Sequence, residues 1–311
     1  MPLDPHAKRL LDMLATASPT AALPSSVGAR RESFRKLMSL FGSHVPIGRI
    51  EDRALAVAGG VLSVRVYTPI ATTFDPLPGM IFFHGGGLVA GSLNTHDGVC
   101  RTLANETGCR VISVNYRLAP EHRFPTAVLD AYAATLSSVE WAAELGIRRD
   151  RIAVAGDSAG ATLAAIVCQL ARDAHSVDVA AQLLLCPITD FCADTKSRAE
   201  FAEGYLLHQV AIDQDLEHYL PAGHDPRDPL VSPLRASDLQ GLPPAYVHTA
   251  EFDPLRDEGR AYADALTRAG VKTAYTCHPG MVHLFYGMAV VIPYARAAMR
   301  HIGAEIRTAL G

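Results

Sequence analysis

Residues 154–160, Val-Ala-Gly-Asp-Ser-Ala-Gly, constrain the fold more than any other segment of the chain. An apolar, strand-like run over residues 151–155 breaks at Gly156, and a helical pattern begins at Ala159. A strand that reverses into a helix within so few residues needs glycines where the two backbones nearly touch. This G-x-S-x-G pattern therefore places Ser158 at the tip of a strand-turn-helix, where a helix N-terminus favours developing negative charge.

Ser158 has two interpretations. The bare pentapeptide would favour a helix N-cap or a chance match in a loop. The strand before it and the helix after it reverse that preference, because this setting exposes the hydroxyl at the edge of a sheet. We therefore interpret Ser158 as a candidate nucleophile.

The composition limits what this serine can serve. A chain of 311 residues with 49% hydrophobic residues can bury a large core, as one large domain or two small ones. The formal net charge is −4 and no block of Lys or Arg occurs, which argues against nucleic acid or an anionic membrane surface as the main partner. A small neutral substrate fits better, and the sequence leaves open whether the chain forms a homodimer.

The cysteines and the N-terminal residues bear on the cellular location. Six cysteines are scattered without a C-x-x-C pair, which gives no support to a zinc ribbon or a thioredoxin-like site. We expect reduced, mostly buried thiols. Residues 1–19 intersperse charges with leucines, and no segment approaches the roughly eighteen apolar residues of a membrane span. A cytoplasmic protein is expected, with a lost or removed signal left open.

Strand-like and helix-like segments alternate over most of the chain, which predicts an α/β fold with a mainly parallel sheet covered by helices on both faces. We expect strands at 62–67, 80–83, 110–116, 151–155, 182–186, 245–249 and 272–277. We expect helices at 97–106, 126–144, 159–172, 256–269 and 287–310, the last one interrupted at Pro293.

Two regions depart from this alternation. Residues 1–45 resemble two short helices split at Ser18-Pro19 and Pro24-Ser25, ahead of the first strand signal. Residues 189–235 form an insertion with a helical stretch from about 198 to 220. Together they could form a cap over the strand ends, or the insertion could be an extra surface helix. Residues 46–311 would then hold the catalytic domain.

Three consecutive glycines follow the buried strand 80–83, in His84-Gly85-Gly86-Gly87. They predict a backbone that lets another group approach closely, with N–H groups free to donate. In acyl transfer such fixed donors stabilise the oxyanion by on the order of 3 kcal/mol each. A flexible glycine turn is the alternative interpretation.

A serine nucleophile needs a base and an acid that orients it. Asp253 lies in a loop between the strand 245–249 and a helix, so it is a candidate for the acid and equally for a helix cap. Asp257 and Glu258 would lie in the first turn of that helix, where complementing the helix dipole explains them.

His283 is the candidate base, because it follows the last strand and completes the order Ser, Asp, His. His278, His248 and His122 are its rivals, and His248 falls within a strand pattern that suggests a place in the core. No two histidines have the spacing of a zinc protease, so no metal site is expected.

These motifs together resemble the hormone-sensitive-lipase-like esterases, or family IV, of the α/β-hydrolase fold. The resemblance covers about residue 79 to the C-terminus and rests on residues 84–87, 116–121, 156–160, 253–258 and the segment around His283. It implies a helical cap, Ser158 as the nucleophile, His283 as the general base and then acid, and Asp253 as its orienting acid. It further implies that Gly85, Gly86 and Ala159 donate the oxyanion-hole N–H groups.

The resemblance implies a serine carboxylesterase that hydrolyses short- to medium-chain esters through an acyl-enzyme, without a metal or organic cofactor. A catalytically silent binding protein, or an amidase or acyltransferase with the same triad, are the alternatives. One position departs from the family, which usually has His-Gly-Phe where this chain has His283-Leu284-Phe285. Pocket candidates, which could equally be cap core, are Leu88, Phe201, Tyr205, Leu206 and Leu284.

Overall fold

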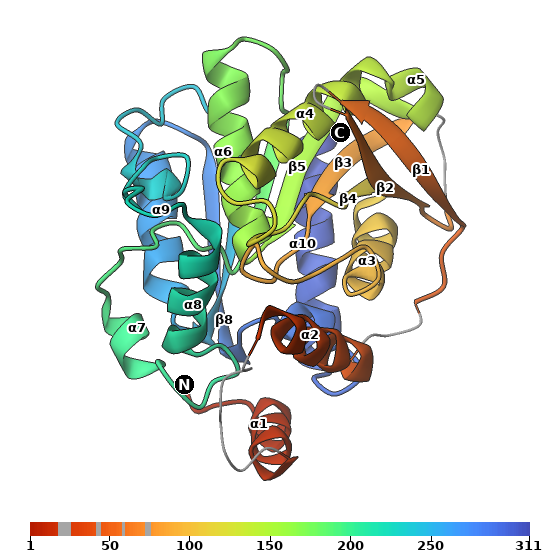
Figure 1. Ribbon diagram of the computed structural model, residues 1–311. Helices are drawn as coiled ribbons and strands as arrows, with labels where there is room; N and C mark the ends of the chain where they lie inside the picture. The colour runs from red at the N-terminus through yellow and green to blue at the C-terminus, as the bar shows by residue number, and fades with distance from the viewer. Residues whose placement is uncertain (18–25, 42–44, 58–59, 72–75) are drawn as a thin grey trace.

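The computed structural model in Figure 1 describes residues 1–17, 26–41, 45–57, 60–71 and 76–311. Its eight strands are β1 Arg49–Val57, β2 Gly60–Thr68, β3 Leu77–Phe83, β4 Arg110–Val114, β5 Ile147–Asp157, β6 Ala181–Leu185, β7 Ala245–Phe252 and β8 Thr273–Val282. They form one sheet in the order β1-β2-β4-β3-β5-β6-β7-β8. β1 pairs antiparallel with β2, and β2 with β4, whereas the pairs from β4 to β8 are parallel.

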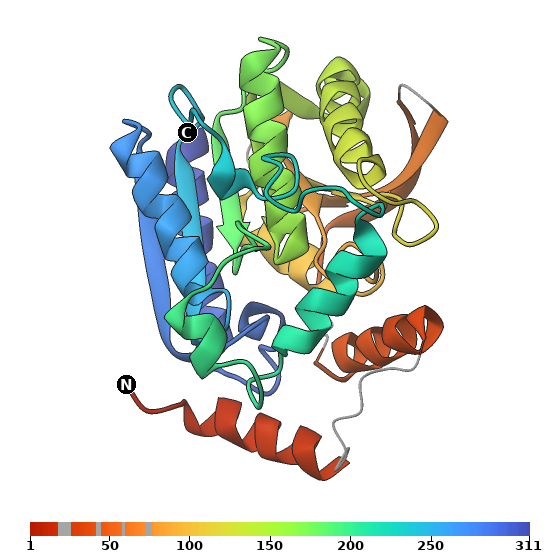
Figure 2. The same cartoon turned by 60° about the vertical axis from the view of Figure 1, so that its left-hand side comes forward.

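Helices cover both faces of the sheet (Figures 1 and 2). α3 and α10 pack together on one face, and α4, α6 and α9 lie on the other. The helices are α1 Pro5–Ala17, α2 Val27–Phe41, α3 Asp97–Thr107, α4 Thr126–Glu140, α5 Ala142–Leu145, α6 Ala159–Asp173, α7 Lys196–Glu200, α8 Gln209–Tyr219, α9 Arg256–Arg268 and α10 Tyr294–Leu310.

β3 shows why a continuous apolar run becomes a central strand. Successive side chains of a strand point to opposite faces, so Ile81 and Phe83 enter the core under α4 and α6. Met80 and Phe82 enter the second core, under α3 and α10. All four side chains are fully buried. The predicted fold class, a mainly parallel sheet between two helical layers, is confirmed.

Several expected boundaries were wrong. β1 was missed, because it is an edge strand in which only Leu55 is buried and no apolar alternation marks it. The helix expected at 198–220 is two helices, α7 and α8, since Gly204 and Leu206 both have positive φ between them. The expected breaks at Ser18-Pro19 and Pro24-Ser25 lie outside the described residues.

Two further helices end or begin at positions that the pattern does not mark. The helix expected at 126–144 ends at Glu140, where Trp141 caps it, and α5 follows. The closing helix begins at Tyr294 rather than at Gly287. Pro293 therefore starts this helix instead of interrupting it.

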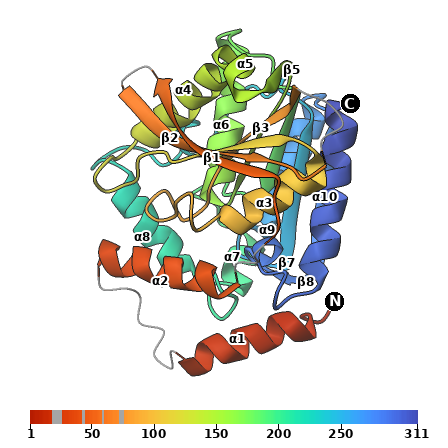
Figure 3. The same cartoon turned by 90° about the vertical axis from the view of Figure 1, so that its right-hand side faces the viewer.

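Four helices gather at one end of the sheet. Figure 3 shows α1, α2, α7 and α8 grouped in the lower part of the view, although they come from two regions of the chain far apart in sequence. Over the described part of the chain, no helix is long and apolar enough to cross a membrane.

Candidate active site

The turn between β5 and α6 holds Ser158 in a strained conformation, with φ 51° and ψ −122°. Glycines allow the strand and the helix to approach so closely. A Cβ on Gly156 would collide with the carbonyl oxygen of Gly160, and a Cβ on Gly160 would collide with that of Phe83. The Ser158 N–H donates to the Leu185 carbonyl of the neighbouring strand β6 at 2.8 Å. The tight turn therefore fixes the serine over the strand ends.

The structure brings the three predicted side chains into one hydrogen-bonded line. His283 follows β8, and its Nε2 lies 3.1 Å from Ser158 Oγ. Asp253 follows β7, and its Oδ2 lies 2.7 Å from His283 Nδ1. All three residues are buried. With the proton on Nδ1, the imidazole donates to Asp253 and its Nε2 accepts from the serine hydroxyl.

The contacts of Asp253 separate it from the neighbouring acids. Its second oxygen, Oδ1, accepts the Leu255 N–H at 2.9 Å, which fixes the carboxylate facing the imidazole. Asp257 instead accepts the Ser197 N–H at 2.8 Å, and Glu258 is bound to Arg198 at 2.8 Å. These two carboxylates tie α9 to α7 and have no contact with His283.

The rival histidines lie elsewhere in the described chain. His278 Nε2 is 3.2 Å from His248 Nδ1, and His248 Nε2 is 3.0 Å from Glu305 on α10. Burial lowers the pKa of His278 to about 3, so this imidazole is neutral at ordinary pH. His122 is exposed on a loop. His283 alone among them reaches Ser158.

The structure differs from the expectation for Gly85. Its N–H donates to Asp157 Oδ1 at 2.9 Å, so it is not free for a substrate oxygen. Gly86 and Gly87 line the cavity that holds Ser158, and Gly85 does not. In the described chain, the N–H groups of Gly86, Gly87 and Ala159 have no protein acceptor. The loop therefore presents its second and third glycines to the cavity, and its first glycine anchors it to Asp157.

Buried aromatic and polar groups hold this loop from below. The Tyr116 hydroxyl donates to the His84 carbonyl at 2.6 Å, and the two rings stack with centroids 4.4 Å apart. Burial lowers the pKa of His84 to about 3, so the ring stays neutral. Asp157 is also 3.2 Å from His96. The glycine loop is thus built on a fixed support, as a preorganised donor site requires.

A cavity of about 360 Å³ opens above Ser158, between the strand ends and the helices α2 and α8. Of the five pocket candidates, Leu206 and Leu284 line it. Leu88, Phe201 and Tyr205 do not: Leu88 points into the main core, and Phe201 and Tyr205 pack against Phe252. The lining residues that the sequence did not indicate are Arg30, Ser33, Phe34, Leu37, Gly87, Ile188, Phe191, Leu207, His208, Ala211, Ile212, Gln214 and Asp215.

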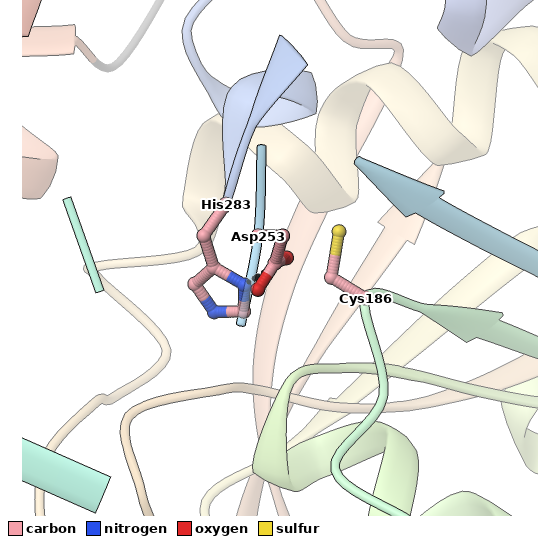
Figure 4. A group of neighbouring side chains, drawn as sticks. All are labelled: Cys186, Asp253 and His283. Carbon is pink, nitrogen blue, oxygen red and sulfur yellow. Dashed lines mark hydrogen bonds and ion pairs between the residues drawn. The ribbon is translucent and has the colours of Figure 1, made fainter. Parts of the chain in front are cut away.

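One group of side chains in the described residues has the proximity of metal ligands. Figure 4 draws the side chains of Cys186, Asp253 and His283. Their ligand atoms lie within 4.8 Å of one another. Burial and the charge of Asp253 raise the pKa of the Cys186 thiol well above its ordinary value. A protonated thiol is a poor metal ligand, and Asp253 and His283 are already bonded to each other. The donor chemistry therefore does not fit a metal site.

Leu284 is the departure from the family pattern, and it occupies the left-handed region with φ 60°. A bulky residue there is strained by about 1–2 kcal/mol, which a glycine would avoid. Its side chain is buried and lines the cavity next to His283. Leu284 therefore fills space that a glycine would leave open.

We expect Leu284→Gly to widen the cavity and to raise the octanoate-to-acetate ratio of kcat/KM by about tenfold. Lost burial of about 2 kcal/mol offsets the relief of strain, so the melting temperature changes little. The measurement is hydrolysis of p-nitrophenyl esters of increasing acyl length. Leu88→Gly is the matched control, because Leu88 has φ 64° but lies outside the cavity lining, and its ratio should stay constant. An equal shift in both variants would contradict this role of Leu284.

The chain is similar to known hydrolases over almost its whole length. Residues 80–287 match a family described as the alpha/beta hydrolase fold. Carboxylesterase NlhH of Mycobacterium tuberculosis is 41% identical over 99% of this chain and 96% of its own length. An arylesterase of Saccharolobus solfataricus is 38% identical over 92% of this chain and 93% of its own length.

Two solved structures are similarly close. The ester-hydrolase EH1AB1 from the metagenome of Lake Arreo, solved in complex with a derivative of bipyridine phosphonate, has a TM-score of 0.95 and 39% identity, with 98% of each chain covered. An esterase of Pyrobaculum calidifontis has a TM-score of 0.92 and 38% identity, with 100% of each chain covered.

Proposed function

We infer the reaction of this chain from its family, because the chain belongs to the hormone-sensitive-lipase-like branch, family IV, of the α/β-hydrolase fold family. Its relatives are named carboxylesterases and esterases, and the chain is a carboxylic ester hydrolase. We propose that Ser158, His283 and Asp253 carry out the hydrolysis through an acyl-enzyme intermediate. The continuous line of contacts from Ser158 Oγ to Asp253 Oδ2 is the observation that supports this assignment.

The first half of the reaction forms the acyl-enzyme. Ser158 Oγ attacks the ester carbonyl carbon while its proton passes to His283 Nε2. Asp253 stabilises the resulting imidazolium through Nδ1. The imidazolium then gives its proton to the alkoxy oxygen of the substrate, the bond from the carbonyl carbon to that oxygen breaks, and the alcohol leaves.

The carbonyl oxygen gains a negative charge in this step. We propose that Gly86, Gly87 and Ala159 donate to it, because their N–H groups have no other acceptor in the described chain and these residues adjoin Ser158. Ala159 is the first residue of α6, so its N–H also carries the positive end of the helix dipole. Removing one such donor typically slows acyl transfer by about 10²–10³-fold.

The second half of the reaction repeats these transfers with water. His283 takes a proton from a water molecule that attacks the acyl carbon, and Ser158 leaves with that proton as the carboxylic acid forms.

We propose that the helices of residues 1–45 and of the 189–235 insertion act as the cap. The observation that supports this is that α2 and α8 line the cavity. A cavity of about 360 Å³ lies near the small end of ligand pockets, at roughly 300–1,000 Å³, which favours short to medium acyl chains.

A p-nitrophenyl alkylphosphonate tests the proposed intermediate directly. The phosphorus centre resembles the tetrahedral intermediate, so its attack by Ser158 should be fast and irreversible. We expect release of about one equivalent of p-nitrophenol, loss of esterase activity, and a mass increase on the peptide that contains Ser158. Heat-unfolded protein should not react. A label on another residue, or hydrolysis that continues after stoichiometric labelling, would contradict the assignment.

We also propose that the protein acts in the cytoplasm. The structure records all six cysteines as free thiols, four of them buried. Thiols persist in this form in a reducing compartment. Fractionation of cells that express the native gene should recover the esterase activity with cytoplasmic markers, and recovery with the membrane or external fraction would refute this location.

A further inference from the structure

Two adjacent arginines dock the second helix, α2, above the active site. Arg31 donates from Nε to the carbonyl oxygen of Val89, two residues after the glycine loop, at 2.8 Å. It also binds Glu121 through both terminal nitrogens. Arg30 binds Asp215 of α8, with Nη2 2.9 Å from Oδ2. Figure 2 shows α2 and α8 side by side at the end of the sheet. The Arg31 contacts attach the helix to the loop, whereas Arg30 reaches across to the other cap helix.

Asp215 lies against Gly87 of the glycine loop. Its side chain is 8% exposed, and its carboxylate occupies the space where a Cβ of Gly87 would be. Gly87 has φ +68°, a conformation that favours glycine, so the loop approaches this carboxylate without a side chain between them. Asp215, Arg30 and Gly87 line the same cavity as Ser158. A carboxylate therefore lies next to the donors proposed for the substrate oxyanion.

A negative charge at this place opposes the reaction. The substrate oxygen becomes negative in the transition state, and a nearby buried carboxylate repels it through a medium of low dielectric constant. Burial raises the pKa of Asp215, and the charge of Arg30 acts in the opposite direction. The other titratable group acting on Asp215 is His218, one turn further along α8, and His208 and His283 also line the cavity.

We propose that Arg30 is a charge-compensating residue that neutralises Asp215, so that the oxyanion forms beside a dipolar ion pair instead of a bare carboxylate. The inference rests on the proposed function, because it needs an oxyanion on the substrate. A purely structural clasp between α2 and α8 is the competing explanation of the same 2.9 Å contact. The two explanations differ in symmetry: a clasp is lost when either partner is removed, whereas the charge is harmful only when Arg30 is removed.

The experiment is a double-mutant cycle on p-nitrophenyl butyrate hydrolysis. We expect Arg30→Met to lower kcat by roughly 30-fold at pH 8 with little change in KM, from the Coulomb repulsion of one charge several ångströms away. Asp215→Asn leaves the positive charge of Arg30 without its partner near the oxyanion and should raise kcat by up to about threefold. In the double variant Arg30→Met with Asp215→Asn, kcat should return to within about threefold of the wild-type value. Arg30→Lys, which keeps the positive charge, should retain most of the wild-type kcat.

The pH dependence gives a second readout. Burial raises the pKa of Asp215, which is neutral below that pKa and charged above it. The ratio of Arg30→Met to wild-type kcat should therefore fall as the pH rises through the pKa of Asp215. Taking the ratio at each pH removes the pH effects that the two proteins share. Arg30→Gln, which keeps polar contacts without the charge, replaces Arg30→Met if that variant does not fold.

Equal losses in Arg30→Met and Asp215→Asn, without recovery in the double variant, would overturn the inference in favour of a clasp. A ratio of Arg30→Met to wild-type kcat that rises with pH would also contradict it. These outcomes require an active wild type. A wild type without hydrolysis, or one whose phosphonate label is not on Ser158, would instead refute the proposed function.

Discussion

Replacing Ser158 with alanine is expected to lower kcat for p-nitrophenyl butyrate by about 10⁴–10⁶-fold, as for nucleophile removal in other serine hydrolases. The reason is that no other hydroxyl lies within reach of His283 Nε2 in the described chain. The fold should persist, because alanine carries the same Cβ as serine in the strained turn. The backbone N–H of residue 158 also keeps its bond to the Leu185 carbonyl. The melting temperature should shift by no more than about 2 °C.

Ser138→Ala is the matched control for this measurement. Ser138 is a fully buried serine on α4 whose hydroxyl has no partner among the described residues, and it lies outside the cavity lining. Its variant should therefore hydrolyse esters at the wild-type rate. If Ser158→Ala kept more than about one hundredth of kcat, the nucleophile would have to be another residue.

Asp253→Asn should lower kcat by about 10⁴-fold with little effect on KM. An asparagine can still accept the Leu255 N–H, but its amide NH₂ then faces His283 Nδ1 and donates to it. The imidazole must carry its proton on Nε2 in that arrangement, so it cannot accept the proton of Ser158. The measurement is steady-state kinetics with short-chain p-nitrophenyl esters.

The control for this variant is Asp257→Asn, four residues along the chain. Asp257 binds the Ser197 N–H at 2.8 Å and has no contact with the imidazole, so its loss should change kcat by less than about threefold. Some loss of stability is expected where α7 meets α9. A large loss of kcat in Asp257→Asn with an active Asp253→Asn would reverse the assignment of the acid.

The sequence predicted correctly those features that depend on a single short segment of backbone. Gly156 and Gly160 marked the tight turn, because a strand and a helix cannot meet there with a Cβ between them. The run 80–83 marked a strand buried on both faces. Missed boundaries, such as β1 and the break between α7 and α8, occur where the segment is exposed or where a residue other than glycine takes a positive φ.

The orientation of the loop 84–87 could not be predicted from its own residues. Three glycines predicted a close approach, but not which N–H faces the substrate. Asp157 takes the Gly85 N–H, and that contact joins residues 72 positions apart. The sequence pattern contains no signal for it, because the position of the Asp157 carboxylate depends on how β3 and β5 pair.

For the candidate site, the sequence alone predicted the order and type of the groups proposed to react: Ser158 in its turn, Asp253 after β7 and His283 after β8. The surroundings of these three side chains follow only from the packing of distant segments. The cavity wall combines Arg30 of α2 with Asp215 of α8, which are 185 positions apart and carry no motif. The physical reason is that turns and strands follow from the conformations open to neighbouring residues, whereas a wall between two helices exists only once both have packed over the same strand ends.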